Sequence, residues 1–171
     1  MRVFKEEQRF TQKWLIAVMV ISTIIPIVIL TSKMMQSNHG IQWKEYILTI
    51  SLIIFASFSI FLFKLKTRID EIGIHYRFLP FHFSNKTIKW TEIKECYTRK
   101  YDALSEYGGW GIKGGSLWNK KNGIAYNVKG EIGLQIVLKS DKKILIGTQK
   151  QNEIDNTIKN YLSKFDSGTS E

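Results

Sequence analysis

Two long apolar segments lie near the start of the chain, and neither contains a charged residue. The first covers residues 14–32 (WLIAVMVISTIIPIVILTS) and the second covers residues 46–63 (YILTISLIIFASFSIFLF). At about 1.5 Å rise per residue, a helix of either length nearly crosses the hydrocarbon core of a bilayer, which is about 30 Å thick. A helix at the surface of a soluble domain would carry a polar stripe, and these segments have none. The pattern therefore predicts two membrane-spanning helices.

The first segment also shares features with a cleaved signal peptide. Its apolar stretch is, however, longer than that of a signal peptide, and no small-residue cleavage site of the A-x-A type follows it. The second segment would also lose its partner if the first were removed. We therefore expect both segments to remain as a transmembrane hairpin.

Lysine and arginine are distributed unequally around the two segments. The basic residues before the first segment and after the second are Arg2, Lys5, Arg9, Lys13, Lys64, Lys66 and Arg68. The loop between the segments holds Lys33 and Lys44. Because cytoplasmic flanks carry the excess of basic residues, we expect a multi-pass protein of the inner (cell) membrane with both termini in the cytoplasm.

After residue 64 apolar and polar residues alternate, which is typical of β-strands. Residues 65–70 and 74–83 alternate around a turn at 70–73 and predict a β-hairpin. Further strands are expected at residues 87–90, 94–101, 123–128, 133–139 and 143–147. An apolar stripe at helical spacing predicts a helix over residues 151–165.

About seven strands followed by one helix predict a mostly β domain of the α+β class. That order fits a small barrel or sandwich closed at one end by the helix. The expected organisation is an N-terminal tail with the helical hairpin over residues 1–63, a cytoplasmic domain over 64–165 and a disordered tail over 166–171.

Five segments of the domain resemble the bacterial pleckstrin-homology-like (PH-like) family, in the membrane-anchored type with two N-terminal spans. They are TRIDEIGIHYRFLPF, IKWTEI, YGGWGIKGG, AYNVKGEIGLQIVL and ILIGTQ. The resemblance implies a seven-stranded barrel capped by a C-terminal helix, with no enzymatic activity and no cofactor. Some PH domains bind phosphoinositides through a basic first loop. Here that turn carries Asp70 and Glu71, which repel phosphates, so specific inositide recognition is not expected.

The composition argues against several kinds of site. A single cysteine, Cys96, rules out internal disulfides, CxxC motifs and cysteine-rich zinc sites, and we interpret it as a small buried hydrophobe. The three histidines, His39, His75 and His82, have no metal-ligand spacing and are expected at the solvated surface. The net charge of +10 suits anionic lipid headgroups beside the chain, and nucleic acid is not an expected partner.

Residues 107–115 (YGGWGIKGG) form the most distinctive stretch. They contain a formal G-x-G-x-x-G pattern, but no helix pattern follows it, so a dinucleotide site is not expected. The large aromatics here either fold back onto the domain or form a contact surface together with nearby lysines. The candidate interaction surface consists of Tyr107, Trp110, Lys113, Trp118, Lys120 and Lys121.

Together these patterns predict a non-catalytic module for protein interaction or assembly at the inner membrane face, with non-specific contact with anionic lipid. No catalytic, cofactor or metal site is expected. The protein partner is open, and the spans could support homo-oligomers. Two alternatives remain: an enzyme or small-ligand receptor that uses residues 107–115, and an accessory subunit of a membrane transporter.

Overall fold

The structure is a computed structural model of the whole chain, and it describes residues 3–36, 42–114 and 122–167, with side chains up to residue 163. The chain divides into two compact units. One comprises residues 1–9 and 64–171, and the other comprises residues 10–63. We refer to them as the β domain and the helical unit.

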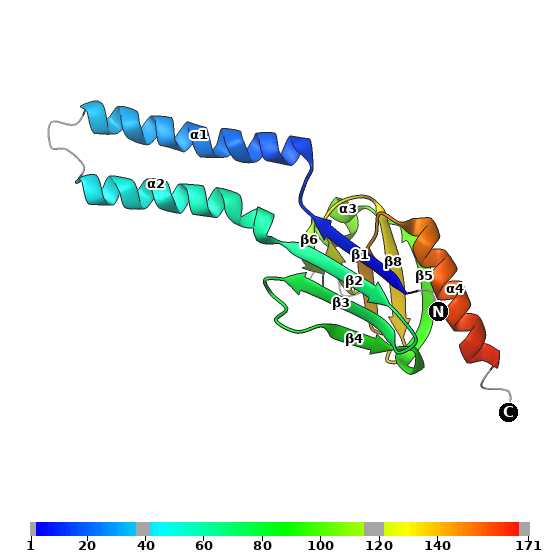
Figure 1. The fold of residues 1–171 in the computed structure, drawn as a ribbon. Coiled ribbons are helices and arrows are strands. Elements are labelled where there is room, and N and C mark those ends of the chain that lie inside the picture. The colour runs from blue at the N-terminus through cyan, green and yellow to red at the C-terminus, as the bar shows by residue number, and fades with distance from the viewer. Residues whose placement is uncertain (1–2, 37–41, 115–121, 168–171) are drawn as a thin grey trace. The chain divides into compact units, whose positions relative to one another are not determined.

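The helical unit contains two antiparallel helices, α1 (Lys13–Gln36) and α2 (Trp43–Phe58), and α2 continues into a 3-10 turn, η1 (Ser59–Leu62) (Figure 1). Pro26 lies inside α1 without ending it. The hydroxyls of Thr31 and Tyr46 are 2.9 Å apart and join the helices by a hydrogen bond. Where the unit meets the β domain in the chain, the rings of Phe10 and Phe63 pack edge to face.

Both helices are long and apolar enough to cross a membrane, as the sequence pattern predicts. Their side chains are mostly exposed, which distinguishes them from the core helix of a soluble protein. Many large apolar residues of α1 and α2 are at least half exposed, including Ile21, Ile24, Val28, Leu48, Leu52 and Phe55. Such surfaces need an apolar environment outside the chain.

The first sheet of the β domain is antiparallel and has the order β1-β2-β3-β4 (Figure 1). Its strands are β1 (Phe4–Arg9), β2 (Lys64–Ile69), β3 (Gly73–Leu79) and β4 (Lys86–Lys89). The helical unit is therefore inserted between two neighbouring strands of one sheet. Arg9, the last residue of β1, lies opposite Lys64, the first residue of β2.

The position of β1 corrects the predicted organisation, in which residues 1–63 were tail and hairpin only. The sequence hides this strand because two of its three inward side chains are polar. Glu6 accepts hydrogen bonds from the Thr148 hydroxyl (2.7 Å) and the Gln149 backbone N–H (2.8 Å), and the Gln8 amide donates to the Gly147 carbonyl (2.7 Å). These bonds satisfy the buried polar groups and tie β1 to the C-terminal half of the domain.

The second sheet has the order β5-β8-β9-β7-β6. Its strands are β5 (Ile93–Lys100), β6 (Gly111–Gly114), β7 (Ile124–Asn127), β8 (Ile132–Leu138) and β9 (Lys143–Gly147). The β7–β9 pair is parallel and the other pairs are antiparallel. All seven predicted strands are present, and β1 and β6 are additional. The described strands form two hydrogen-bonded sheets, so a closed seven-stranded barrel stays a prediction.

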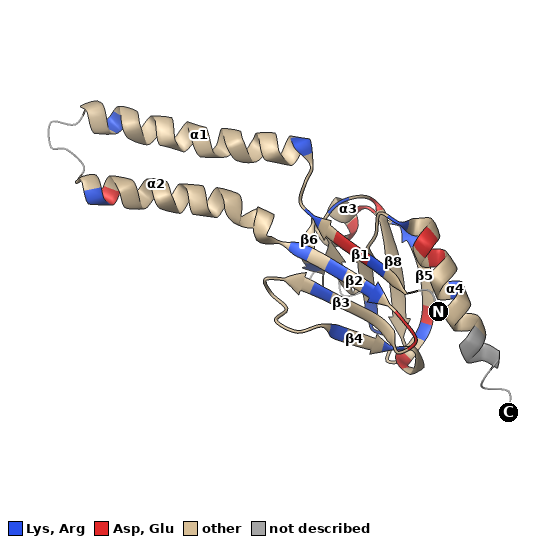
Figure 2. Cartoon of the chain, viewed as in Figure 1, with Lys and Arg blue, Asp and Glu red and all other residues tan. Residues whose placement is uncertain are grey.

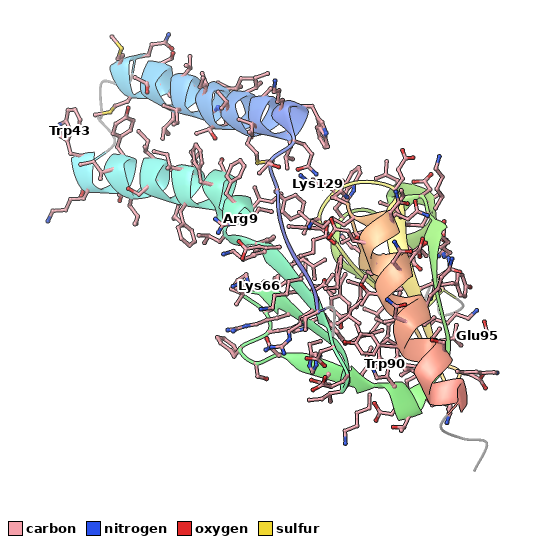
Figure 3. The ribbon with its side chains drawn as sticks, turned by 45° about the vertical axis from the view of Figure 1, so that its right-hand side comes forward. Arg9, Trp43, Lys66, Trp90, Glu95 and Lys129 are labelled. Carbon is pink, nitrogen blue, oxygen red and sulfur yellow. The ribbon has the colours of Figure 1, made fainter. Side chains whose placement is uncertain are left out.

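Three helical segments complete the domain: η2 (Trp90–Glu92), α3 (Ala103–Tyr107) and the C-terminal helix α4 (Gln151–Ser167). Helix α4, predicted from its apolar stripe, contacts β1 and β5, one edge strand of each sheet. Its Ile154, Ile158 and Tyr161 are buried. Trp90 lies under α4, and its ring stacks on that of Tyr161 with 5.4 Å between centroids (Figure 3).

We expect Glu6→Ala to lower the free energy of unfolding by about 1–3 kcal/mol, because it leaves the buried Thr148 hydroxyl and Gln149 N–H without their acceptor. Thermal unfolding of the full chain in detergent, followed by near-ultraviolet circular dichroism, measures the change. Lys5→Ala alters the adjacent exposed residue of the same strand and should stay within about 0.5 kcal/mol of wild type. Equal stability of the two variants would show that β1 is not held by Glu6.

Candidate functional site

Two residues of the candidate interaction surface, Tyr107 and Trp110, pack against the interior of the domain. Tyr107 is buried against Tyr101, Ala103 and Leu145, and Trp110 packs partly buried against the same cluster. The Tyr107 hydroxyl accepts a hydrogen bond from Arg99 (3.1 Å). Tyr107 therefore belongs to the core and not to an exposed surface. Lys113, on β6, is exposed, whereas Trp118, Lys120 and Lys121 lie outside the described residues.

Backbone geometry accounts for the glycines of this stretch. Gly108 has a φ of 76° and ends α3 in the left-handed conformation. At Gly114 a β-carbon would lie 2.1 Å from the carbonyl oxygen of Gly123, so β6 and β7 can approach only if this residue is glycine. The G-x-G-x-x-G pattern runs from a helix end into a strand, which is not the strand-to-helix turn of a dinucleotide site.

The acidic residues near this stretch have structural partners. Glu106 forms a bidentate ion pair with Arg99, with N–O distances of 2.7 and 3.2 Å, and Arg99 keeps the pKa of Glu106 below its usual range. Asp102 caps α3 by accepting hydrogen bonds from the backbone N–H groups of Leu104 and Ser105. These contacts place both carboxylates in local structure and not in an acid–base pair.

Charged residues recur along strands β1, β2 and β3 of the first sheet (Figure 2), and the burial patterns place most of them on its outer face. Strands β1, β2 and β3 alternate between buried and more exposed positions, so their basic side chains share this face. We call it the basic face, and it consists of Lys5, Arg9, Lys64, Lys66, Arg68 and Arg77, with the acids Glu7 and Asp70. In Figure 3 the Lys66 side chain points away from the domain core.

Glu7 is at the centre of the ion pairs on the basic face. Its carboxylate lies 2.9 Å from Arg9, 3.1 Å from Lys64 and 3.5 Å from Lys66. Hydrogen bonds from Arg9 and then Lys64 lower the pKa of Glu7 to about 2. Exposed pairs of this kind are screened by solvent and add little stability, but three cations around one anion leave the surface strongly positive.

A hollow of about 420 Å³ opens on the β1–β3 part of the sheet. Its lining includes the basic residues Lys5, Lys66 and Arg68 and the acids Glu6 and Glu7. His75 and, from the β3–β4 connection, Asn85 also border it. Both acids already have partners, Glu6 in Thr148 and Gln149 and Glu7 in the basic residues around it. The hollow therefore combines positive charge with hydrogen-bonding groups. It can accommodate an acidic or phosphate-bearing group beside Lys5, Lys66 and Arg68.

Asp70 organises the end of the sheet at the β2–β3 turn. Its carboxylate accepts from Ile72 N–H (3.0 Å) and pairs with His75 (2.9 Å) and Arg68 (3.0 Å), while its carbonyl accepts from the indole of Trp90 (2.8 Å). Burial alone raises the pKa of Asp70, but His75, Ile72 and Arg68 outweigh it and the pKa lies below its usual range. This carboxylate is thus occupied within the turn.

The histidines of the domain differ from the prediction that they are solvated surface residues. His75 bridges Asp70 and the Thr87 hydroxyl (2.8 Å). His82 is half-buried, and its Nδ1 accepts a hydrogen bond from Phe78 N–H (3.2 Å). Burial and the nearby Lys86 lower the pKa of His82, which keeps Nδ1 available as an acceptor. Cys96, predicted to be buried, is half-buried, and burial raises the pKa of its thiol to about 12.

Among the residues that the structure describes, no three His, Cys, Asp or Glu side chains are placed to hold a metal ion. Sequence reasoning named Lys5 and Arg9 as basic residues that flank the helices, but it did not predict that they lie on a strand beside β2. The residues of β1, FKEEQR, alternate between buried and exposed positions. Two of the buried residues, Glu6 and Gln8, are polar, so the sequence shows no alternation of apolar and polar residues that would predict a strand. No protein-family model matches the chain, and no curated protein matches its sequence.

Asp70→Asn should lower the free energy of unfolding by about 1–3 kcal/mol at neutral pH, because it removes a buried charge-assisted network. The folded pKa of Asp70 is depressed, so its stabilisation is complete above the unfolded value and is lost as pH falls through the folded value. The difference from wild type should therefore shrink as the pH falls below the unfolded value, which is about 4. Urea unfolding at several pH values measures it.

Glu71→Gln is the matched control, because Glu71 is the exposed neighbour in the same turn. It should leave stability within about 0.5 kcal/mol of wild type at neutral pH. A penalty for Asp70→Asn that is constant across the acid range would contradict the role of the Asp70 charge.

Proposed function

We propose that the chain is a non-catalytic, membrane-anchored interaction module of PH-like fold that binds a protein partner at the cytoplasmic face of the inner membrane. The observation that carries the proposal is the basic face. Six basic residues lie there with two acidic ones, and the 420 Å³ hollow opens on its β1–β3 part. The excess of positive charge on this face favours an acidic protein segment and also gives non-specific attraction to anionic lipid.

The connection between the two units supports anchoring by a hairpin. Strand β1 precedes the first helix and β2 follows the second, and the two strands pair from Phe4–Ile69 to Arg9–Lys64. A chain that leaves and re-enters one sheet must cross the membrane an even number of times. Cleavage of α1 as a signal peptide would remove β1 from the sheet. With the basic flanks, this favours two crossings and termini on the cytoplasmic side.

The order of elements supports a PH-like fold. A four-stranded sheet is followed by a second sheet and a C-terminal helix, and α4 contacts one edge strand of each sheet. In the proposed fold the two sheets form one barrel and α4 is its capping helix. The burial of Ile154, Ile158 and Tyr161 is what such a cap requires.

The alternatives receive less support from the described residues. A receptor or enzyme that uses residues 107–115 needs their aromatic groups at a pocket, but Tyr107 and Trp110 are engaged in packing. An accessory role beside a transporter is one form that the proposed protein interaction can take. In either case the basic face is the surface to test.

Replacing both Lys5 and Lys66 by Glu should weaken capture of the protein partner about tenfold, because the change reverses two charges at the hollow. The tagged full chain is purified from membranes in mild detergent, and co-purified proteins are quantified by mass spectrometry. The control replaces Lys142 and Lys143, exposed at the β8–β9 hairpin, by Glu. If both variants retain the same partners as wild type, the basic face is not the interaction surface.

A further inference from the structure

The β3–β4 connection, residues 80–85, exposes two large aromatic side chains. Phe81 is 58% exposed and Phe83 is 90% exposed. Single apolar residues at a surface are common, but two phenylalanines on one short connection form an apolar projection. We call residues 80–85 the phenylalanine loop.

Contacts of His82, which lies between Phe81 and Phe83, hold this loop in shape. His82 N–H donates to the Phe78 carbonyl (2.8 Å), and the His82 carbonyl accepts from the Arg77 side chain (3.0 Å). The His82 ring faces inward and packs against the rings of Tyr76 and Tyr126. Phe81 stacks on the buried Phe78 ring, with 6.2 Å between the centroids, and keeps its other side exposed, whereas Phe83 is almost fully exposed.

The register of the first sheet shows which end of the sheet carries the loop. Leu79, where the loop begins, lies opposite Lys64, and Lys64 lies opposite Arg9. Neighbouring strands are about 4.8 Å apart, so these three residues lie side by side. Phe63, directly before Lys64, and Phe10, directly after Arg9, are the two ends of the helical unit in the chain.

We propose that the phenylalanine loop is a third membrane contact, in which Phe81 and Phe83 enter the headgroup region of the bilayer beside the point where the hairpin leaves it. The inference rests on the proposed membrane anchor. If the two helices cross the bilayer, the sheet end with Arg9, Lys64 and Leu79 is the end nearest the lipid. The loop starts within one strand spacing of Lys64.

The side chains of the loop favour lipid as the partner that it contacts. Aromatic rings gain most where an apolar phase begins, at the boundary between headgroups and acyl chains. Lys86 follows the loop and is exposed, which suits an anionic headgroup. With the two helices, the loop would give the β domain a third attachment and so limit its rotation on the membrane.

The test uses the full chain with Cys96→Ala, because Cys96 is the only cysteine. Single cysteines are introduced by Phe83→Cys, by Ile72→Cys and by Leu52→Cys, and each is labelled with a small fluorophore. Ile72 is the matched control, since it is 57% exposed but lies in the turn at the opposite end of β3. Leu52, in α2, reports the anchor itself.

Each labelled protein is reconstituted in vesicles of phosphatidylcholine and phosphatidylglycerol. Fluorescence is measured with lipids spin-labelled near the headgroup or near the chain end, and separately with aqueous iodide. The proposal predicts that lipid quenches the labels at 83 and 52 while iodide quenches the label at 72.

The remaining outcomes overturn the inference in distinguishable ways. If lipid quenches the label at 52 but iodide quenches the label at 83, as it does the label at 72, the loop does not contact the membrane and the anchor is retained. A label at 83 shielded from both quenchers would mean that protein covers the loop. Absence of lipid quenching at 52 would overturn the membrane anchor itself, and the proposed function with it.

Discussion

Strands β1 and β2 pair along their whole length although two apolar helices separate them in the chain. This pairing constrains the rest of the molecule. It makes the helical unit an insertion into one folded domain, and it brings both ends of the unit to one end of the first sheet. It also adds Lys5 and Arg9 to the basic face, beside Lys64 and Lys66.

Interior and surface polar groups have different roles in the β domain. Buried ones, such as Glu6, Gln8 and Asp70, are matched with specific donors and acceptors, and they fix where β1 and the β2–β3 turn lie. Lysines and arginines on the basic face have fewer anions than cations around them. A sheet face on which cations outnumber anions is suited to recognising an acidic surface, which underlies the proposed interaction function.

Local patterns predicted those elements whose buried face is apolar. Ile74, Tyr76 and Phe78 alternate on β3, and Ile154, Ile158 and Tyr161 recur at helical spacing on α4, so both elements were predicted. Strand β1 was missed because Glu6 and Gln8 face the interior, and β6 because glycines begin and end it. The partners of Glu6 are about 140 residues away along the chain, and no local pattern reports such a contact. Because such long-range contacts leave no local pattern, the basic face was only partly predicted. The sequence likewise could not decide whether Tyr107 is buried or exposed.

The most direct test of the insertion is to remove it. Residues 10–63 are replaced by Asn-Gly, which joins Arg9 to Lys64 through a two-residue hairpin turn. The comparison is a chain that begins at Lys64 and lacks β1, and thermal unfolding of both is followed by circular dichroism. If β1 is an integral strand, the joined chain is soluble and unfolds cooperatively, and the chain without β1 melts at least about 10 °C lower or fails to fold. Equal melting temperatures would contradict the account, because β1 would then contribute nothing to the stability of the β domain.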